Sequence, residues 1–171
     1  MSVRSSIEQV TKSVMGALIP EEGKTDILDT LQMEHDEVQS LLDKLVDSED
    51  GREQRSLVTK IKQALIPHSK AEEQVVYTPI AALTGEKAKI DGAEGFTEHA
   101  LATATLMQLD KLTPNTPEFK ADAKVLRELI NHHVREEEKN IWAQVQENFS
   151  DAQREQMNRD FLAAKKLVQV P

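Results

Sequence analysis

Apolar residues recur along this chain at spacings of three and four, which is the spacing of one face of an α-helix. Between about residues 26 and 46 this apolar face contains Leu28, Leu31, Val38, Leu42 and Leu45. Three further segments carry similar stripes, at about 53–83, 94–112 and 118–148, and Phe96 is expected to face inward. Gly85 to Gly95 are expected to form the longest connection. Residues that favour turns separate the four segments. Because short connections make long helices antiparallel neighbours, the pattern predicts an all-α, up-down-up-down four-helix bundle.

Shorter segments flank the predicted bundle. Residues 4–19 form an amphipathic pattern that ends at Pro20, and Ser150 is a suitable N-cap for a last helix to about residue 168. The expected organisation is therefore an N-terminal helix (1–25), the bundle (26–148) and a C-terminal helix (149–171). The terminal helices either pack on the bundle or form contacts with a partner, such as a second copy in a homo-oligomer. Pro67 lies inside the second long segment and is expected to kink it or free a carbonyl.

Six polar residues interrupt the apolar faces in a duplicated pattern. The segment His-Ser-Lys-Ala-Glu-Glu at 68–73 reappears as His-Val-Arg-Glu-Glu-Glu at 133–138, an offset of 65 residues. The pair Glu-His at 34–35 recurs at 98–99, an offset of 64. A histidine and a glutamate four residues apart lie on the same face of a helix. The positions that fall on the apolar faces are His35, His68, Glu72, His99, His133 and Glu137.

A metal site explains this placement, because a buried ionised carboxylate is costly unless it is paired or bound to a cation. The alternative is that each histidine is a hydrogen-bonded core residue and each glutamate lies at a solvated edge. For one histidine that alternative is the better one, but six positions in duplicated register favour two metal ions. Imidazole with carboxylate suits iron, zinc, manganese or copper. Two carboxylates able to bridge, with two histidines per ion, indicate a di-iron centre, with manganese and zinc as alternatives.

The polar residues next to these six are expected to lie at the surface or beside the metal ligands. His132 lies about 100° around the helix from His133 and is expected at the surface, with replacement of His133 as the alternative. Glu138 is the strongest substitute ligand if the fourth helix is slightly overwound. Glu73 and Glu136 are expected to be solvated or to contact a ligand. Solvent exposure is expected for Glu34, Asp36 and Glu37.

Composition excludes several classes of protein. The 171 residues carry 30 acidic and 21 basic side chains, a formal charge of −9, so a nucleic-acid partner is not expected. With no cysteine, disulfides and cysteine-ligated metals are excluded. No apolar run approaches the roughly 20 residues that span a bilayer. Glu8 and Lys12 interrupt any signal-peptide core, so the cytoplasm is the expected compartment, without membrane association.

Residues 26–148 resemble the hemerythrin-like, HHE cation-binding domain family. The resemblance rests on His35, His99, the stretch from His68 to Pro79, and the stretch from His133 to Trp142. It implies a four-helix bundle with a non-haem di-iron centre bridged by Glu72 and Glu137. The oxygen-carrying members have a second histidine one turn after the third-helix histidine, where this chain has Thr103. Ferritin-like ligation needs Glu-x-x-His, and no glutamate lies three residues before any histidine here.

Three functions are compatible with these features. The first is a di-iron protein that handles or senses O2, NO or iron. The second is a peroxide-consuming stress enzyme of catalase or peroxidase type, because Thr103 in place of a histidine opens one iron. The third is a helical partner-binding module stabilised by its metal.

Overall fold

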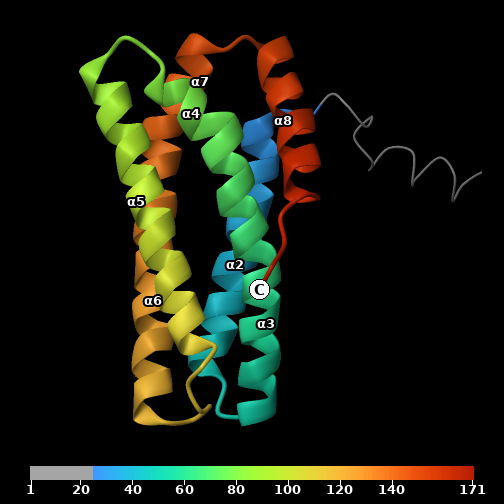
Figure 1. The fold of residues 1–171 in the computed structure, drawn as a ribbon, viewed down its shortest axis with the longest axis vertical. Helices are drawn as coiled ribbons and strands as arrows, with labels where there is room; N and C mark the ends of the chain where they lie inside the picture. The colour runs from blue at the N-terminus through green and yellow to red at the C-terminus, as the bar shows by residue number, and fades with distance from the viewer. Residues whose placement is uncertain (1–24) are drawn as a thin grey trace, which may run out of the picture.

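The computed structural model describes residues 25–171, and all regular structure in that range is helical (Figure 1). Four long helical columns form the predicted up-down-up-down bundle, so the expected fold class is confirmed. The elements are α2 (Ile27–Asp47), α3 (Gly51–Glu72), η1 (Glu73–Tyr77), α4 (Thr78–Ala81), α5 (Glu86–Leu109), α6 (Pro117–Glu136), η2 (Glu137–Ile141), α7 (Trp142–Asn148) and α8 (Asp151–Lys165). The columns are α2, then α3 with η1 and α4, then α5, and then α6 with η2 and α7. Each column contacts the next around the bundle: α2 packs on α3, α3 on α5, α5 on α6, and α6 on α2.

Side-chain caps fix where several helices begin. Asp26, Asp50 and Thr116 accept hydrogen bonds from backbone N–H groups at the starts of α2, α3 and α6. Ser150 caps α8 as predicted and forms a reciprocal capping box with Gln153. These bonds satisfy N–H groups that lack a partner within the helix.

The second and fourth columns contain short π-helical segments. The segment η1 directly follows Glu72, and η2 begins at Glu137, so both lie at the duplicated His-x-x-x-Glu motif. The helix α3 runs on through Pro67, and the π-helical segment η1 begins one to two turns after this proline. The fourth column is thus locally underwound at the motif.

The start of α5 corrects the predicted boundary. The glycine-containing segment 85–95 was expected to be a connection, but α5 already begins at Glu86. Gly92 and Gly95 face the second column, where a Cβ on Gly92 would lie 3.3 Å from Ala81 Cβ. These glycines allow close helix packing instead of forming a loop. The predicted inward position of Phe96 is also wrong, since this side chain is 38% exposed.

A polar layer divides the core into two apolar clusters. One cluster lies toward the turn between α2 and α3 and includes Leu42, Ile61, Leu106 and Leu126. The other lies toward α7 and α8 and includes Leu31 and, from other elements, Ile80, Val145 and Phe161. The six duplicated polar residues are all buried in the layer between the clusters. Apolar packing on both sides therefore fixes the height at which these side chains meet.

The C-terminal helix α8 lies along the outside of α2 and α3 (Figure 1). Phe161 is fully buried against the bundle, and Arg154 Nε donates to Asp26 Oδ2 at 2.7 Å. The predicted N-terminal helix over residues 4–19 lies outside the described residues. Within the described range, none of the helices combines the length and apolar character that crossing a membrane requires.

Candidate metal centre

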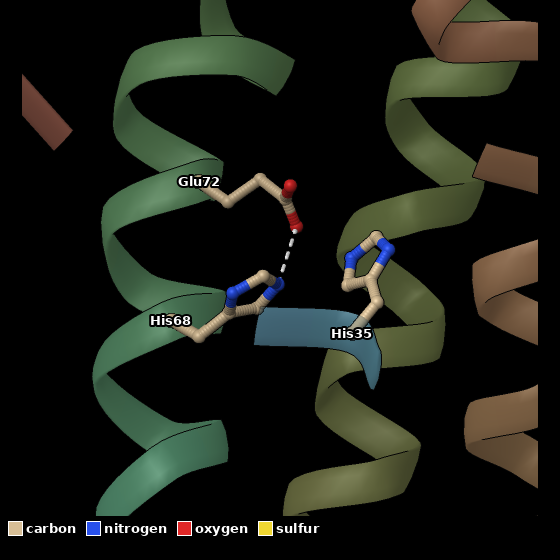
Figure 2. Close-up of side chains that lie close together, drawn as sticks. All are labelled: His35, His68 and Glu72. Atoms are coloured by element: carbon tan, nitrogen blue, oxygen red, sulfur yellow. Dashed lines mark ion pairs between the residues drawn. The ribbon is translucent and has the colours of Figure 1, made fainter. Parts of the chain in front are cut away.

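The four columns bring the predicted histidines together in two pairs. His35 from α2 and His68 from α3 form one pair, with ring centroids 5.1 Å apart (Figure 2). His99 from α5 and His133 from α6 form the other, with centroids 4.7 Å apart. The Nε2 atoms of His99 and His133 are separated by 3.1 Å. That separation suits two nitrogens that each lie about 2 Å from one ion.

Two buried carboxylates lie between these pairs. Glu72 Oε2 is 3.5 Å from His68 Nε2 and 3.3 Å from His99 Nε2. Glu137 Oε2 is 3.4 Å from His35 Nε2 and 3.3 Å from His133 Nε2. Each carboxylate therefore contacts one imidazole of each pair, which is the position of a group that bridges two ions. Two sets of buried donors have metal-binding spacing, namely His35, His68 and Glu72, and Glu72, His99 and His133.

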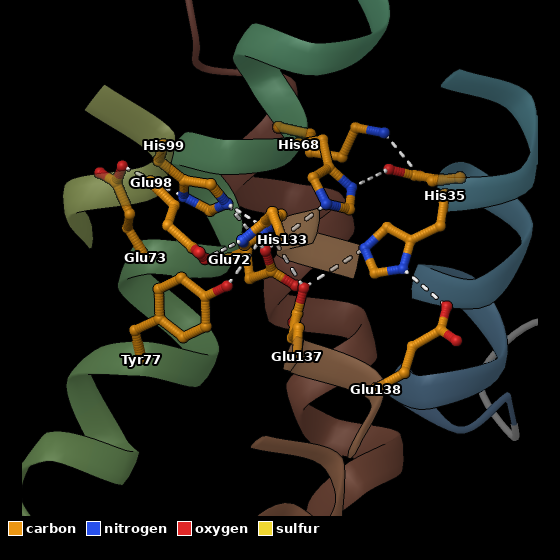
Figure 3. Close-up of polar contacts among 12 residues, drawn as sticks. His35, His68, Glu72, Glu73, Tyr77, Glu98, His99, His133, Glu137 and Glu138 are labelled. Atoms are coloured by element: carbon orange, nitrogen blue, oxygen red, sulfur yellow. Dashed lines mark hydrogen bonds and ion pairs between the residues drawn. The ribbon is translucent and has the colours of Figure 1, made fainter. Parts of the chain in front are cut away.

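The outer nitrogen of every one of these imidazoles faces a further glutamate (Figure 3). Nδ1 of His68 lies 2.9 Å from Glu34 Oε2, and Nδ1 of His133 lies 2.7 Å from Glu98 Oε2. The corresponding distances are 3.2 Å from His35 to Glu138 and 3.4 Å from His99 to Glu73. Because a carboxylate only accepts hydrogen bonds, the Nδ1 atoms of His35, His68 and His133 carry the proton, whereas Nδ1 of His99 lies near Glu73 without forming a hydrogen bond. In a neutral imidazole the Nε2 lone pair then points inward, in the tautomer that binds a metal.

These outer glutamates repeat with the same offsets as the histidines. Glu34 and Glu98 each precede a histidine of the site, and each contacts the histidine of the next column. Glu73 and Glu138 each follow an inner glutamate, and each contacts a histidine of the other repeat. The prediction that Glu34 faces solvent is therefore wrong, because its side chain is only 17% exposed. The repeated Glu-His pairs at 34–35 and 98–99 were a sequence signal for this outer ring of four glutamates, which are Glu34, Glu73, Glu98 and Glu138.

The inner carboxylates have unsatisfied oxygens in the described structure. Both oxygens of Glu72 and both of Glu137 lack a hydrogen-bond partner, although the two side chains are 0% and 3% exposed. His35 Nε2 also lacks a partner. Buried carboxylates without partners are strongly unfavourable, whereas bound cations would satisfy all these atoms. The donor set thus fits one or more metal ions held by nitrogen and oxygen.

The charges in this layer shift several pKa values in the metal-free protein. Burial lowers the pKa of His68, but the charge of Glu72 and the hydrogen bond with Glu34 outweigh it and raise the pKa to about 9. Burial also lowers the pKa of His133, but hydrogen bonds with Glu137 and Glu98 outweigh this effect and raise the pKa to about 10. Burial would raise the pKa of Glu137, yet contacts with His133 and His35 hold it well below the usual range. Without metal, protons on His68 and His133 compensate the inner carboxylates.

Aromatic rings pack on the two histidine pairs, and one of them breaks the symmetry. Trp142 is the counterpart of Tyr77 at the 65-residue offset, and it stacks on His35 with centroids 6.1 Å apart. Tyr77 packs on His99 at 5.2 Å, but its hydroxyl also lies 3.5 Å from His133 Nε2. Burial, followed by the charges of Glu137 and Glu72, raises the pKa of Tyr77 well above its ordinary value. A neutral phenol therefore faces only the His99–His133 pair.

All six residues predicted from the sequence come together in this layer, and the neighbouring polar residues lie around it. The imidazole of His132 is 56% exposed, as predicted for a surface residue. Glu138 contacts an imidazole from outside instead of replacing Glu137. Residues not predicted to belong to the site are Tyr77, Trp142, Glu98, Phe161 and Lys165.

A helical bundle with a buried cluster of histidine and glutamate defines a class of cation-binding proteins. Residues 26–145 match the sequence pattern of the Hemerythrin HHE cation binding domain. The chain belongs to this family, which confirms the resemblance found in the sequence.

One curated relative extends the comparison. The protein named DNA nickase from Nostoc sp. (strain PCC 7120 / SAG 25.82 / UTEX 2576) is 31% identical over 169 residues. The match covers 98% of this chain and 47% of the relative, so the chain spans about half of that protein's length. No solved structure matches the chain closely enough to count as a relative.

Proposed function

We propose that this chain is a di-iron protein that reversibly binds or senses a small diatomic ligand, O2 or NO, or iron itself. The supporting observation is the convergence of four imidazole Nε2 atoms on two buried carboxylates, each of which contacts both histidine pairs. His35 and His68 would hold one ion, His99 and His133 the other, and Glu72 and Glu137 would bridge them. Iron in such a site would supply a redox-active centre for the small ligand.

The charge of the polar layer supports two divalent ions instead of one. Two inner and four outer glutamates contribute six carboxylates to the layer. Lys165 contacts Glu34 at 2.6 Å, and Lys70 contacts Glu73 at 2.7 Å. With ionised carboxylates and neutral imidazoles, about four negative charges remain uncompensated, and two divalent cations would balance them. A single divalent ion would leave a buried excess of negative charge.

Loading apoprotein anaerobically with Fe(II) and then admitting O2 or NO tests this proposal. The proposal predicts a ligand-dependent absorption spectrum that reverses when the gas is removed. Irreversible oxidation on first contact with O2, together with no spectral response to NO, would contradict reversible ligand handling.

A second candidate is consumption of peroxide, which the phenol of Tyr77 favours. The Tyr77 hydroxyl lies beside His133 Nε2 and is the type of group that can donate a proton or an electron to a bound oxidant. Sustained loss of peroxide by the iron-loaded protein, abolished in Glu72→Ala and slowed in Tyr77→Phe, would support the enzyme. Equal rates in all three proteins would exclude catalysis at this centre.

Strand cleavage in DNA is a candidate only because the Nostoc relative bears the name DNA nickase. The formal charge of −9 disfavours DNA binding by this chain, so the absence of a nucleic-acid partner stays a prediction. Metal-dependent nicking of supercoiled plasmid by the wild type, but not by Glu72→Ala, would overturn that prediction. Intact plasmid under the same conditions would support it.

A further inference from the structure

The surroundings of the His35–His68 pair are crowded and contain a cation. Trp142 stacks on His35 with an interplanar angle of 17°, and Phe161 meets the edge of His68 with centroids 5.8 Å apart. The ammonium group of Lys165 lies 2.6 Å from Glu34 Oε1, beside the same imidazole. Two rings from α7 and α8 thus cover this side and block access, and the positive charge of Lys165 repels a metal cation.

His133 borders a small cavity of about 20 Å³ between α5 and the fourth column, whereas the cavity beside His35 and His68 is about 10 Å³ and has Glu34 as its one carboxylate. Tyr77, His133 and Glu137 line its inner end. Its walls carry four further carboxylates, those of Asp91, Glu94, Glu98 and Glu136. Gly95 also lines the cavity, and its lack of a side chain leaves room for the ring of Tyr77.

The carboxylates of this cavity form a series that leads from solvent to the centre. Glu94 is exposed, Glu98 and Glu136 are half-buried, and Glu137 is 3% exposed. At the inner end, Glu98 Oε2 contacts His133 Nδ1 at 2.7 Å, and both oxygens of Glu137 lack a hydrogen-bond partner. Among the described ion pairs, the lysine that reaches the cavity wall is Lys87, which contacts Asp91.

We propose that this cavity is the path by which divalent cations reach the centre, with Glu94 at its mouth and His133 and Glu137 at its inner end. The inference rests on the proposed metal centre. Exposed carboxylates bind divalent ions weakly enough to release them, and buried nitrogen and carboxylate donors then hold them. A cleft lined by one sign of charge concentrates counter-ions and accelerates their association by about 10- to 1,000-fold.

Stopped-flow mixing of the 171-residue apoprotein with Co(II) tests the path, because cobalt bound by imidazole and carboxylate is coloured. The variants are Glu94→Gln and Glu94→Lys. Glu147→Gln and Glu147→Lys are matched controls, since Glu147 is exposed on α7 and the changes in net charge are identical. We expect the association rate to fall about threefold in Glu94→Gln and about tenfold in Glu94→Lys, and by less than half in either control. The final spectrum and cobalt content should match the wild type in every variant, and high salt should reduce the differences.

Equal association rates in the Glu94 and Glu147 variants would overturn the path while leaving the metal centre intact. A wild-type apoprotein that binds no cobalt would overturn the metal centre and the path together. Slower Co(II) association in the Glu94 variants than in the Glu147 variants, with unchanged final stoichiometry, would establish the cavity as the path by which the metal enters.

Discussion

At the scale of single residues, the outer glutamates explain how four histidines can share a buried layer. The carboxylates of Glu34, Glu98 and Glu138 each accept the Nδ1 proton of one imidazole and thereby fix the ring with Nε2 facing inward, and Glu73 lies 3.4 Å from Nδ1 of His99. The inner glutamates are then the groups that need a cation. Removing an outer partner should weaken metal binding without removing a ligand.

The variant Glu98→Ala tests this role of the outer ring. Loss of the carboxylate frees His133 to rotate and lowers its basicity, so we expect Co(II) affinity to fall about 10- to 100-fold. A competition titration against a chelator measures the change. His132→Ala is the control, because His132 contacts the other oxygen of Glu98 from the surface. Equal affinities for Glu98→Ala and the wild type would show that the contact does not position a ligand.

Metal affinity should also depend on pH in a defined direction. The pKa values of His68 and His133 are about 9 and about 10 in the metal-free protein, so both imidazoles carry a second proton at neutral pH. An ion must displace these protons, and affinity should therefore rise with pH until about pH 9 to 10. The folding stability of the apoprotein should change with pH in the opposite direction. A raised histidine pKa stabilises the fold at low pH, and that stabilisation is lost as the pH rises through 9 to 10.

Titrations of Zn(II) or Co(II) binding at several pH values between 6 and 8 measure this dependence. Calorimetry in two buffers of different ionisation enthalpy counts the protons released, and we expect about two per fully loaded chain. Binding that is independent of pH across this range would contradict the protonated state of the two imidazoles.

At the scale of helices, the close contact between α5 and the second column determines how the Tyr77 ring meets the centre. A Cβ on Gly95 would lie 2.6 Å from Cε2 and Cζ of Tyr77, closer than real Cβ contacts allow. The π-helical segment η1, which contains Tyr77, follows the ligand Glu72 directly. Local underwinding and a missing side chain on the facing helix together place the phenol beside His133.

The pair Gly95→Ala and Gly92→Ala tests this packing. Alanine favours a helix interior by about 1 kcal/mol over glycine at either position. At Gly95 the added methyl must displace the Tyr77 ring, so overpacking should lower the free energy of unfolding by about 1–3 kcal/mol. At Gly92 the nearest atom is Ala81 Cβ at 3.3 Å, and the change should be close to neutral. Chemical denaturation of both variants measures the difference, and equal stabilities would show that Tyr77 is not held tightly.

At the scale of the whole molecule, the polar layer joins all four columns between two apolar clusters. Metal ions in this layer would connect helices that are distant in the sequence. Metal binding to the folded state alone adds about 4 kcal/mol of stability when the free ion is at 1,000 times its Kd. Chelation should therefore lower the melting temperature of the wild type by several degrees. Glu72→Ala is the control, and a melting temperature equally sensitive to chelator in that variant would place the stabilising ion elsewhere.

The sequence predicted the bundle and the six inner residues because both follow from helical periodicity. His35, His68 and Glu72 lie on the same faces as leucine and valine, and the structure buries all of them. The outer partners could not be derived in this way, since Glu34 and Glu98 reach histidines of neighbouring columns and look like surface residues on their own helices. The same limit applies to Gly92 and Gly95, which indicate a loop locally but allow helix contact in the fold.

The number of iron atoms bound per chain tests the central claim most directly. Apoprotein reconstituted anaerobically with excess Fe(II), passed through a desalting column and analysed for iron and protein, should retain two iron atoms per chain. Glu72→Ala and Glu137→Ala, which each remove one carboxylate placed between the two histidine pairs, should retain fewer. A wild-type value of zero or one, or two atoms retained in both variants, would contradict a di-iron centre built from these residues.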